Sequence, residues 1–282
     1  MSFNLGFIGG GNMSTAIAQG IIRSGAHPKN KIWVSGPHLK NLQHWEVLGT
    51  EVTTKNGEVF HNCDVIFLGV KPGMLHTAVN DCINTLPSLP VSCKPVLFIS
   101  MLAGIRIDEL QKALRALSKD VAVVRIMPNT PLTVGAGACL YTPDEKTTPD
   151  QCAIVEKLMN SSGICEKVPE TMMNSLGSLV GCGPAYIFVV IEALADGAVK
   201  QGAPRHLAQR FAAQMVMGSA KMVLESGKHP GLLKDEVCSP GGSTIAGIAE
   251  LEEGRIRTLI TSLLVIELWP YCRAHHRCFC AR

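Results

Sequence analysis

The sequence shows no excess of charge of either sign, and this limits the partners that it can bind. Its 26 lysines and arginines stand against 23 aspartates and glutamates, which gives a formal net charge of +3. The basic residues are scattered rather than gathered into the stripe that a nucleic-acid backbone attracts. We therefore expect no nucleic acid among its partners.

Long uncharged apolar runs and a targeting segment are missing as well. We find no run that we expect to span a bilayer, and so we expect no membrane association. The first apolar run, Ser2–Ile8, leaves no room for a signal or transit peptide before it. These absences predict a cytoplasmic protein.

Secretion features are absent although the chain holds 11 cysteines. The cysteines spread singly between Cys63 and Cys238 are therefore expected to be buried thiols rather than a disulfide framework. Further potential zinc ligands gather near the C-terminus: Cys272, His275, His276, Cys278 and Cys280. Their spacing matches no usual pair of ligand knuckles, so we expect no metal.

A glycine turn near the N-terminus stands where a dinucleotide site requires one. An expected strand ends at Ile8, and a periodic helix follows a turn made of Gly9, Gly10, Gly11, Asn12 and Met13. Strand, glycine turn and helix form the context of the dinucleotide fingerprint. Gly9 would make the tight turn and Gly11 would let a pyrophosphate approach the helix start. Ser14 replaces the third glycine and is still small.

The end of the second expected strand bears on the choice of cofactor. This strand, Lys31–Val34, leads into Ser35, Gly36 and Pro37. No acidic residue follows it to hold a ribose 2′-hydroxyl, and His38 and Lys40 lie nearby. The pattern favours NADPH, with NADH as the second possibility. The alternative interpretation is a plain turn after a strand.

Two further expected strands lead to candidate cofactor-binding residues. The third strand leads to Asn56, and the fourth leads to Val70, Lys71 and Pro72. Ligands of parallel sheets bind beyond the carboxyl ends of the strands, where these residues fall. For Lys71, an ordinary exposed lysine is an equally good interpretation.

Strand and helix patterns alternate up to about Tyr141 and then stop alternating. Such alternation predicts a mainly parallel sheet with helices on both faces. From Pro169 onward, three- and four-residue periodicity dominates and no strand signal is present. We predict an α/β Rossmann-like domain over residues 1–168 and an all-α domain over residues 169–282, with an atypical tail from about residue 258.

The second domain is expected to contain a helix that is apolar on more than one face. It follows Gly181-Cys182-Gly183, with Pro184 at its first position, and includes Ala185–Val199. A helix that is hydrophobic all round must be covered by neighbours from one chain or from two. We infer a homodimer or a higher homo-oligomer.

Hydroxyls and glycines precede another expected helix, Ile245–Glu253. They are Ser239, Gly241, Gly242, Ser243 and Thr244. Glycines let a backbone approach a ligand closely, and the free N–H groups of a helix start attract an anion. Taken alone, the segment fits a capped helix after a tight turn better than a small-anion site, and both interpretations stay open.

These segments together resemble the pyrroline-5-carboxylate reductases, the NAD(P)H enzymes of the last step of proline synthesis. The similar stretches cover residues 3 to about 257 in the family's order: Gly6–Met13, Val70–Pro72, Ala103–Gly104, Val124–Pro131, Gly181–Tyr186, Asp196–Gly202 and Val237–Gly247. The P-G-G-x-T-x-A-G segment is highly specific to that family. The resemblance implies a Rossmann-like domain, a helical dimerisation domain and an active site between them.

The resemblance also implies roles for the second glycine-rich segment. In the family this loop holds the carboxylate of pyrroline-5-carboxylate, a role that would pass to Ser239, Gly241, Gly242 and Ser243. Its threonine, here Thr244, reaches the ring nitrogen and is the implied catalytic residue. Reduction of a protonated cyclic imine to proline needs orientation and a hydrogen-bond partner for nitrogen more than a strong base.

Other charged residues are given no catalytic role. Arg125 lies near the expected cleft and could bind a carboxylate, but a strand arginine at a domain boundary is more often structural. Glu166, Glu170 and Glu225 are expected to be surface charges.

The chain departs from the family pattern at two places, and two other functions compete. Val180 and Cys182 stand where relatives carry hydroxyls, and the apolar run Leu259–Trp269 replaces an alanine-rich helix, which is expected to affect dimer stability. A β-hydroxyacid dehydrogenase-like reductase is disfavoured because Ile187 occupies the position of that class's lysine. A non-catalytic NADPH-binding sensor protein is the other alternative.

Overall fold

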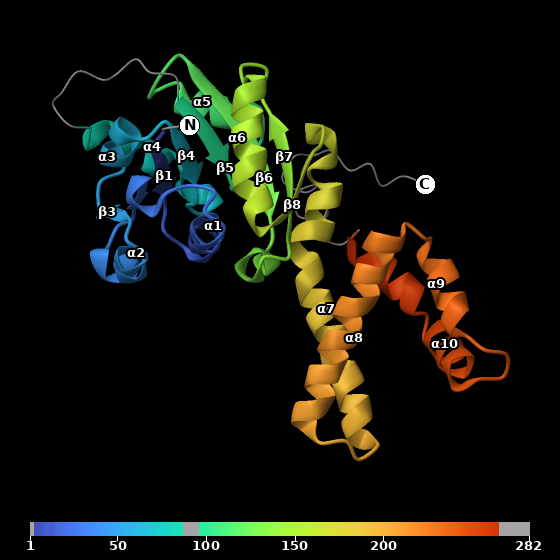
Figure 1. Cartoon of the computed structure of the whole chain (residues 1–282). Helices are drawn as coiled ribbons and strands as arrows, with labels where there is room; N and C mark the ends of the chain where they lie inside the picture. Colours follow the sequence, from blue (N-terminus) through green and yellow to red (C-terminus); the bar gives the residue numbers. More distant parts are fainter. Residues whose placement is uncertain (1–2, 87–95, 265–282) are drawn as a thin grey trace. The chain divides into compact units, whose positions relative to one another are not determined.

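The computed structural model describes residues 3–86 and 96–264. By its internal contacts the chain divides into two units, Met1–Cys182 and Gly183–Arg282, which Figure 1 shows in sequence colours. The tail beyond residue 264, with the cysteines and histidines considered for a zinc site, lies outside the described residues.

The first unit contains an eight-stranded sheet in the order β3-β2-β1-β4-β5-β6-β7-β8. Every neighbouring pair of strands is parallel except β6 and β7, which are antiparallel. The strands are β1 (Leu5–Ile8), β2 (Ile32–Ser35), β3 (Glu51–Thr53), β4 (Val65–Leu68), β5 (Val96–Ser100), β6 (Val121–Pro128), β7 (Gly137–Pro143) and β8 (Gly163–Lys167). The predicted mainly parallel Rossmann-like sheet is confirmed.

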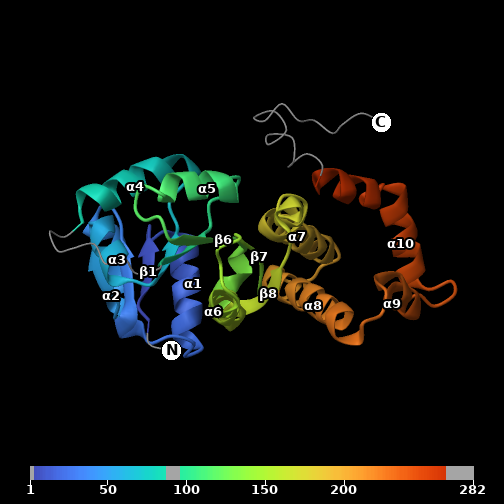
Figure 2. The same ribbon diagram turned by 90° about the horizontal axis from the view of Figure 1, so that it is seen from above.

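Six helices accompany these strands in the described part of the first unit, before the long helix that leads out of it. They are α1 (Asn12–Arg23), α2 (Gln43–Leu48), α3 (Asn56–Asn62), α4 (Leu75–Asn84), α5 (Ile107–Leu114) and α6 (Pro149–Met159). They cover both faces of the sheet, as Figure 2 shows from above.

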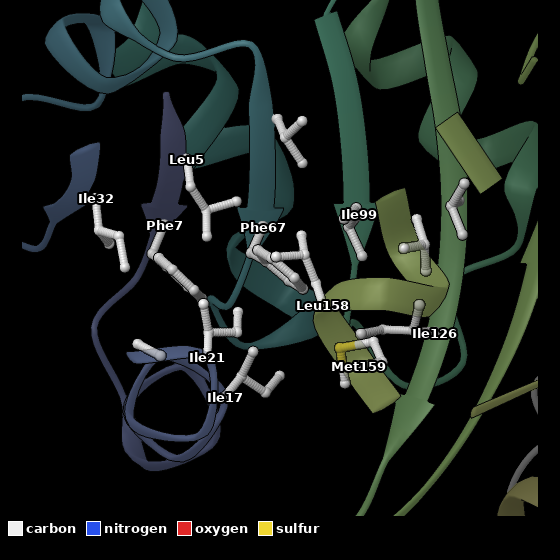
Figure 3. Packing of buried hydrophobic residues seen from close by; sticks show 14 of the residues in the cluster. Leu5, Phe7, Ile17, Ile21, Ile32, Phe67, Ile99, Ile126, Leu158 and Met159 are labelled. Carbon is white, nitrogen blue, oxygen red and sulfur yellow. The ribbon is translucent and has the colours of Figure 1, made fainter. Parts of the chain in front are cut away.

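The two faces of the sheet are covered by different helices because strand side chains alternate with a period of two. Phe7 and Phe67 point to the face covered by α1 and α6, where their rings stack at 4.8 Å (Figure 3). Ile8 and Ile66 point to the face covered by α3, α4 and α5. Both faces are apolar, which is why the strands are almost continuous hydrophobic runs in the sequence.

Within its described residues, 183–264, the second unit has little core of its own. Its helices are the C-terminal part of α7 (Ser175–Lys200), then α8 (Arg205–Ser226), α9 (Pro230–Val237) and α10 (Ser243–Glu253), and residues 256–264 are also helical. The buried apolar cluster that joins α7 to α8 is made of Ala195, Ala208 and Ala212. Large apolar side chains are instead exposed, among them Phe188 at 62% and Phe211 at 66%. Such a surface needs a further cover.

Helix α7 corrects two expectations. It begins at Ser175 and contains Pro184 in its interior, so the prediction that Pro184 opens the helix is wrong. The proline removes one backbone donor, while the turns before it pack closely: a Cβ at Gly177 would lie 3.4 Å from the Met127 side chain on β6. The helix is continuous through the proline.

The second correction concerns apolar length. The helical stretch 170–200 is long and apolar enough, by length and composition, to cross a membrane, so the expectation that no run qualifies is wrong. Length and composition alone are weak grounds for a membrane span, because the core helix of a soluble protein passes the same test. Length and composition therefore do not distinguish a lipid environment of α7 from contact with another protein surface.

His27 makes the stability of the first unit depend on pH. The residue is 4% exposed, its ring stacks on Phe3 at 4.6 Å, and Nε2 has no hydrogen-bond partner in the part of the chain that the structure describes. Burial, with added repulsion from Lys31 and Lys157, holds the pKa of His27 below its usual value. Below about pH 6.5 the unfolded chain therefore takes up a proton that the folded chain resists, and stability falls.

We expect the free energy of unfolding to fall more between pH 7.5 and pH 5.5 in the natural chain than in His27→Phe, which keeps an aromatic ring against Phe3. Denaturant titrations at the two pH values would measure this. An equal fall in both proteins would exclude His27 as the cause.

Candidate functional site

The glycine turn after β1 is packed tightly enough to require its small residues. Gly9 has φ of +100°, and a Cβ there would lie 2.8 Å from the backbone of Gly69. The Ser14 hydroxyl donates to the Gly9 carbonyl at 2.6 Å. A Cβ on Gly69 would lie only 2.1 Å from the same Ser14 hydroxyl oxygen. The expectations that Gly9 makes the turn and that Ser14 permits close packing agree with this geometry.

Helix α1 begins in a way that suits an anion. Its N-cap residue is Gly11, which has no side chain to make a capping hydrogen bond, and the first turn of the helix contains no acidic residue. A Cβ at Gly11 would meet no atom within 4 Å, so the space beside this N-cap residue is open. Asn12 is exposed and Met13 half-buried beside it. Free N–H groups and the helix dipole at such a start attract phosphate.

Ser35 and Asn56 meet at the carboxyl ends of β2 and β3. The Ser35 hydroxyl is buried and donates to Oδ1 of Asn56 at 2.7 Å. The Asn56 amide group donates to the carbonyl of Ala78 at 3.3 Å, and its backbone N–H donates to Asp81 at 3.0 Å. These bonds position the loop after β2 against the start of α3.

The loop after β2 exposes the side chains that could meet an adenosine phosphate. Gly36 is buried, and its N–H donates to the carbonyl of Thr53 at 3.2 Å. Pro37, His38 and Lys40 follow it and are exposed. Basic groups therefore stand at this strand end in the absence of an acidic one, as the sequence predicted.

Val70, Lys71 and Pro72 lie beside the glycine turn because β4 pairs with β1. The N–H of Gly69 donates to the Ile8 carbonyl at 2.8 Å, and a Cβ on Gly9 would lie 2.9 Å from the nitrogen of Val70. Lys71 is exposed at the start of a short 3-10 turn. The structure thus brings all the predicted cofactor-binding residues to one edge of the sheet.

Arg125 is a buried structural arginine. Its side chain is 3% exposed, Nη1 donates to Oε1 of Glu170 at 3.4 Å, and Nη2 donates to Oδ1 of Asn174 at 3.4 Å. Nε has no partner within the described residues. The same Glu170 oxygen accepts the N–H of Ile107, the first residue of α5, at 2.9 Å. The expectation that Glu170 is a plain surface charge is therefore wrong.

We expect Glu170→Gln to lower the free energy of unfolding by about 2 kcal/mol, because it removes the countercharge of a buried guanidinium. The corresponding fall in the thermal midpoint is about 4–8 °C. The double variant Arg125→Met with Glu170→Gln should recover most of the loss, because it leaves no unpaired buried charge. If the double variant is less stable than Glu170→Gln, the pair does not act in this way.

The second glycine-rich segment forms the start of α10 in the second unit. Gly241 has φ of +66°, and the N–H of Gly242 donates to the Ser239 carbonyl at 3.0 Å. Gly242 is the N-cap and provides no side-chain capping bond, while Ser243 and Thr244 occupy the first turn with exposed side chains. Of the two interpretations, the capped helix lacks its side-chain cap, so no side chain occupies the N–H groups of the first turn.

The sequence did not predict two contacts of α2, one with the glycine turn and one with the first turns of α1. The indole N–H of Trp45 donates to the Gly10 carbonyl at 3.2 Å, and Nε2 of His44 lies 3.0 Å from the hydroxyl of Thr15. No sequence signal marks either contact, because α2 is brought to the turn by the pairing of β1 with β2.

Among the described residues no group of histidine, cysteine, aspartate or glutamate side chains is arranged to hold a metal ion. Of the two positions that depart from the family pattern, Val180 is half-buried and Cys182 exposed on α7.

Two protein-family models match the chain. The model described as pyrroline-5-carboxylate reductase dimerisation matches residues 170–265. The model described as NADP oxidoreductase, coenzyme F420-dependent, matches residues 4–104.

Curated proteins match over almost the full length. The pyrroline-5-carboxylate reductase of Arabidopsis thaliana is 40% identical over 265 residues, which are 94% of this chain and 92% of that protein. The pyrroline-5-carboxylate reductase of Escherichia coli (strain K12) is 41% identical over 261 residues, covering 92% of this chain and 94% of that protein.

Solved structures give the same result. A pyrroline-5-carboxylate reductase from Coxiella burnetii superposes with a TM-score of 0.82 at 33% identity, covering 95% of this chain and 97% of the other. The Plasmodium falciparum pyrroline carboxylate reductase with NADP bound gives a TM-score of 0.81 at 30% identity, covering 94% and 95%.

Proposed function

The chain belongs to the pyrroline-5-carboxylate reductase family, and on that premise we propose which of its residues carry the reaction. It is an NAD(P)H-dependent oxidoreductase that reduces 1-pyrroline-5-carboxylate to L-proline, the last step of proline biosynthesis. Membership of the family supports the reaction itself. The starts of α1 and α10, which have no side-chain caps, support the proposed positions of its two reactants.

The residues around the glycine turn fit a dinucleotide. The turn Gly9–Met13 and the uncapped start of α1 receive the pyrophosphate. The absence of a side chain at Gly11 leaves the space that the pyrophosphate needs. Ser35, Gly36, Pro37 and Asn56 shape the adenosine side, and Val70, Lys71 and Pro72 flank the turn. When bound, NADPH or NADH supplies the hydride.

The absence of an acidic residue after β2 supports a preference for NADPH. A carboxylate there would hold a ribose 2′-hydroxyl and repel a 2′-phosphate, whereas this chain offers the exposed His38 and Lys40.

The start of α10 receives the substrate carboxylate. Ser239, Ser243 and the backbone N–H groups that follow Gly242 in the first turn are the donors, and the helix start lacks a capping side chain that would compete with a ligand. The Thr244 hydroxyl bonds to the ring nitrogen and holds the protonated imine in orientation. The protein needs no strong base for this, because protonation of the imine nitrogen already makes the ring carbon a good hydride acceptor.

The assembly follows from the apolar surface of the second unit. The family model that matches residues 170–265 describes dimerisation, so the chain forms a homo-oligomer whose other subunit covers exposed residues such as Phe188 and Phe211. We place α7 against this partner rather than in lipid. The boundary between the dinucleotide-binding domain and the helical domain is placed after residue 168, just beyond β8.

A cytoplasmic location and the absence of a nucleic-acid partner complete the proposal. The thiol form of the buried Cys82, Cys139 and Cys165 supports a reducing compartment. The balanced net charge of +3 supports a small-molecule substrate.

One experiment tests the function against its alternatives. Purified protein should oxidise NADPH only when 1-pyrroline-5-carboxylate is added, and gel filtration of the same sample should give a mass above that of one 30.2 kDa chain. Cofactor binding without turnover would favour a sensor protein. Turnover with a β-hydroxyacid instead of the imine would favour the other reductase class.

A further inference from the structure

The backbone of the dinucleotide turn is not restricted by side chains of its own. Gly9, Gly10 and Gly11 follow one another directly between β1 and α1. Glycine has no Cβ to restrict its φ and ψ angles, so the peptide between Gly10 and Gly11 can rotate at little cost. A turn of this kind needs an outside contact if its N–H groups are to face a ligand in one fixed orientation.

Trp45 provides such a contact. Its side chain is fully buried, and the indole N–H donates to the Gly10 carbonyl at 3.2 Å across 35 residues of sequence. The ring packs against Phe7 of β1 at 5.1 Å with a tilt of 52°. The donor is therefore held by the core and not by the turn that it contacts.

The orientation of the Gly10 carbonyl determines where the next N–H points. In a planar trans peptide the C=O and N–H bonds lie on opposite sides, so a Gly10 carbonyl turned to Trp45 directs the Gly11 N–H away from it. The space beside Gly11 is free for a ligand, because a Cβ there would meet no atom within 4 Å. A rotated peptide would instead present the Gly10 carbonyl to a phosphate, which it would repel.

The packing of Trp45 and Leu42 also requires a glycine at position 10. A Cβ on Gly10 would lie 2.4 Å from the Leu42 side chain and 2.9 Å from Nε1 of Trp45. The space that any other side chain would need is occupied by Leu42 and by the Trp45 donor itself.

We propose that Trp45 is a positioning residue for the cofactor, which fixes the Gly10–Gly11 peptide so that its N–H faces the pyrophosphate of NADPH or NADH. The inference rests on the proposed NAD(P)H-binding function. It assigns Trp45 no contact with the cofactor.

The test is Trp45→Phe, which removes the N–H donor and keeps an aromatic ring in the core. We expect the Kd of NADPH and the Kd of NADH to rise by the same factor, about five- to tenfold. The two nucleotides share the pyrophosphate and differ at the 2′-phosphate, so an equal rise locates the effect at the turn. The KM for pyrroline-5-carboxylate should stay unchanged. Trp33→Phe, in β2 but packed on the other face of the sheet, is the matched control and should change neither Kd.

Unchanged dissociation constants in Trp45→Phe would overturn the inference, and so would a rise confined to NADPH. If Trp45→Phe lowers the thermal midpoint of the nucleotide-free protein, 3-benzothienylalanine at position 45 replaces the N–H by sulfur at nearly the same shape. It must then give the same rise in both constants. If the natural protein binds neither nucleotide, the proposed function itself fails.

Discussion

Thr244→Ala is expected to lower kcat/KM for pyrroline-5-carboxylate about 100-fold, the size of effect found when a positioned hydrogen-bond partner at the reacting centre is lost. The Kd of NADPH should not change, because Thr244 belongs to the second unit and the dinucleotide turn to the first. The thermal midpoint should also stay constant, since the Thr244 side chain is exposed in the first turn of α10.

Two variants separate the hydroxyl of Thr244 from its shape. Thr244→Ser keeps the hydroxyl and should recover most of the activity, whereas Thr244→Val keeps the shape and should not. Steady-state kinetics with both substrates varied would measure each change. Full activity in Thr244→Val would remove the hydroxyl from the mechanism, and the ring nitrogen would then need another partner.

The sheet and its cofactor edge could be predicted from the sequence because their signals are local. Continuous apolar runs mark strands buried on both faces, and Gly9 precedes a helical period directly. The third strand, predicted to lead to Asn56, is observed as β3, Glu51–Thr53. Once the strands are parallel, their carboxyl ends must share an edge, so Asn56 and Lys71 follow without further information.

Contacts between distant segments could not be predicted in this way. Trp45 meets Gly10, and Arg125 meets Glu170, only after the strands have paired, and neither pair has a characteristic spacing. The start of α7 could not be predicted from Pro184 either, because a proline favours the first turn of a helix, whereas α7 begins nine residues earlier, at Ser175, where Gly177 lies beside Met127.

Gly9→Ala is expected to destabilise the first unit and to abolish measurable cofactor binding. The residue has φ of +100°, and an alanine Cβ would lie 2.8 Å from the backbone of Gly69, which cannot move aside as a side chain can. Strain and contact together should cost about 3 kcal/mol, a fall of about 6–12 °C in the thermal midpoint.

Gly11→Ala is the matched variant that separates folding from binding at the same turn. Gly11 is not in the left-handed region, and its Cβ would meet no atom within 4 Å, so the nucleotide-free protein should keep its thermal midpoint. The added methyl group would nevertheless occupy the space that the pyrophosphate needs, and the Kd of NADPH should rise at least about tenfold. Thermal unfolding and nucleotide titration of both variants would show the contrast. If Gly11→Ala binds NADPH as the natural chain does, the pyrophosphate does not lie in front of α1, and the assignment of Gly9–Met13 as its cradle fails.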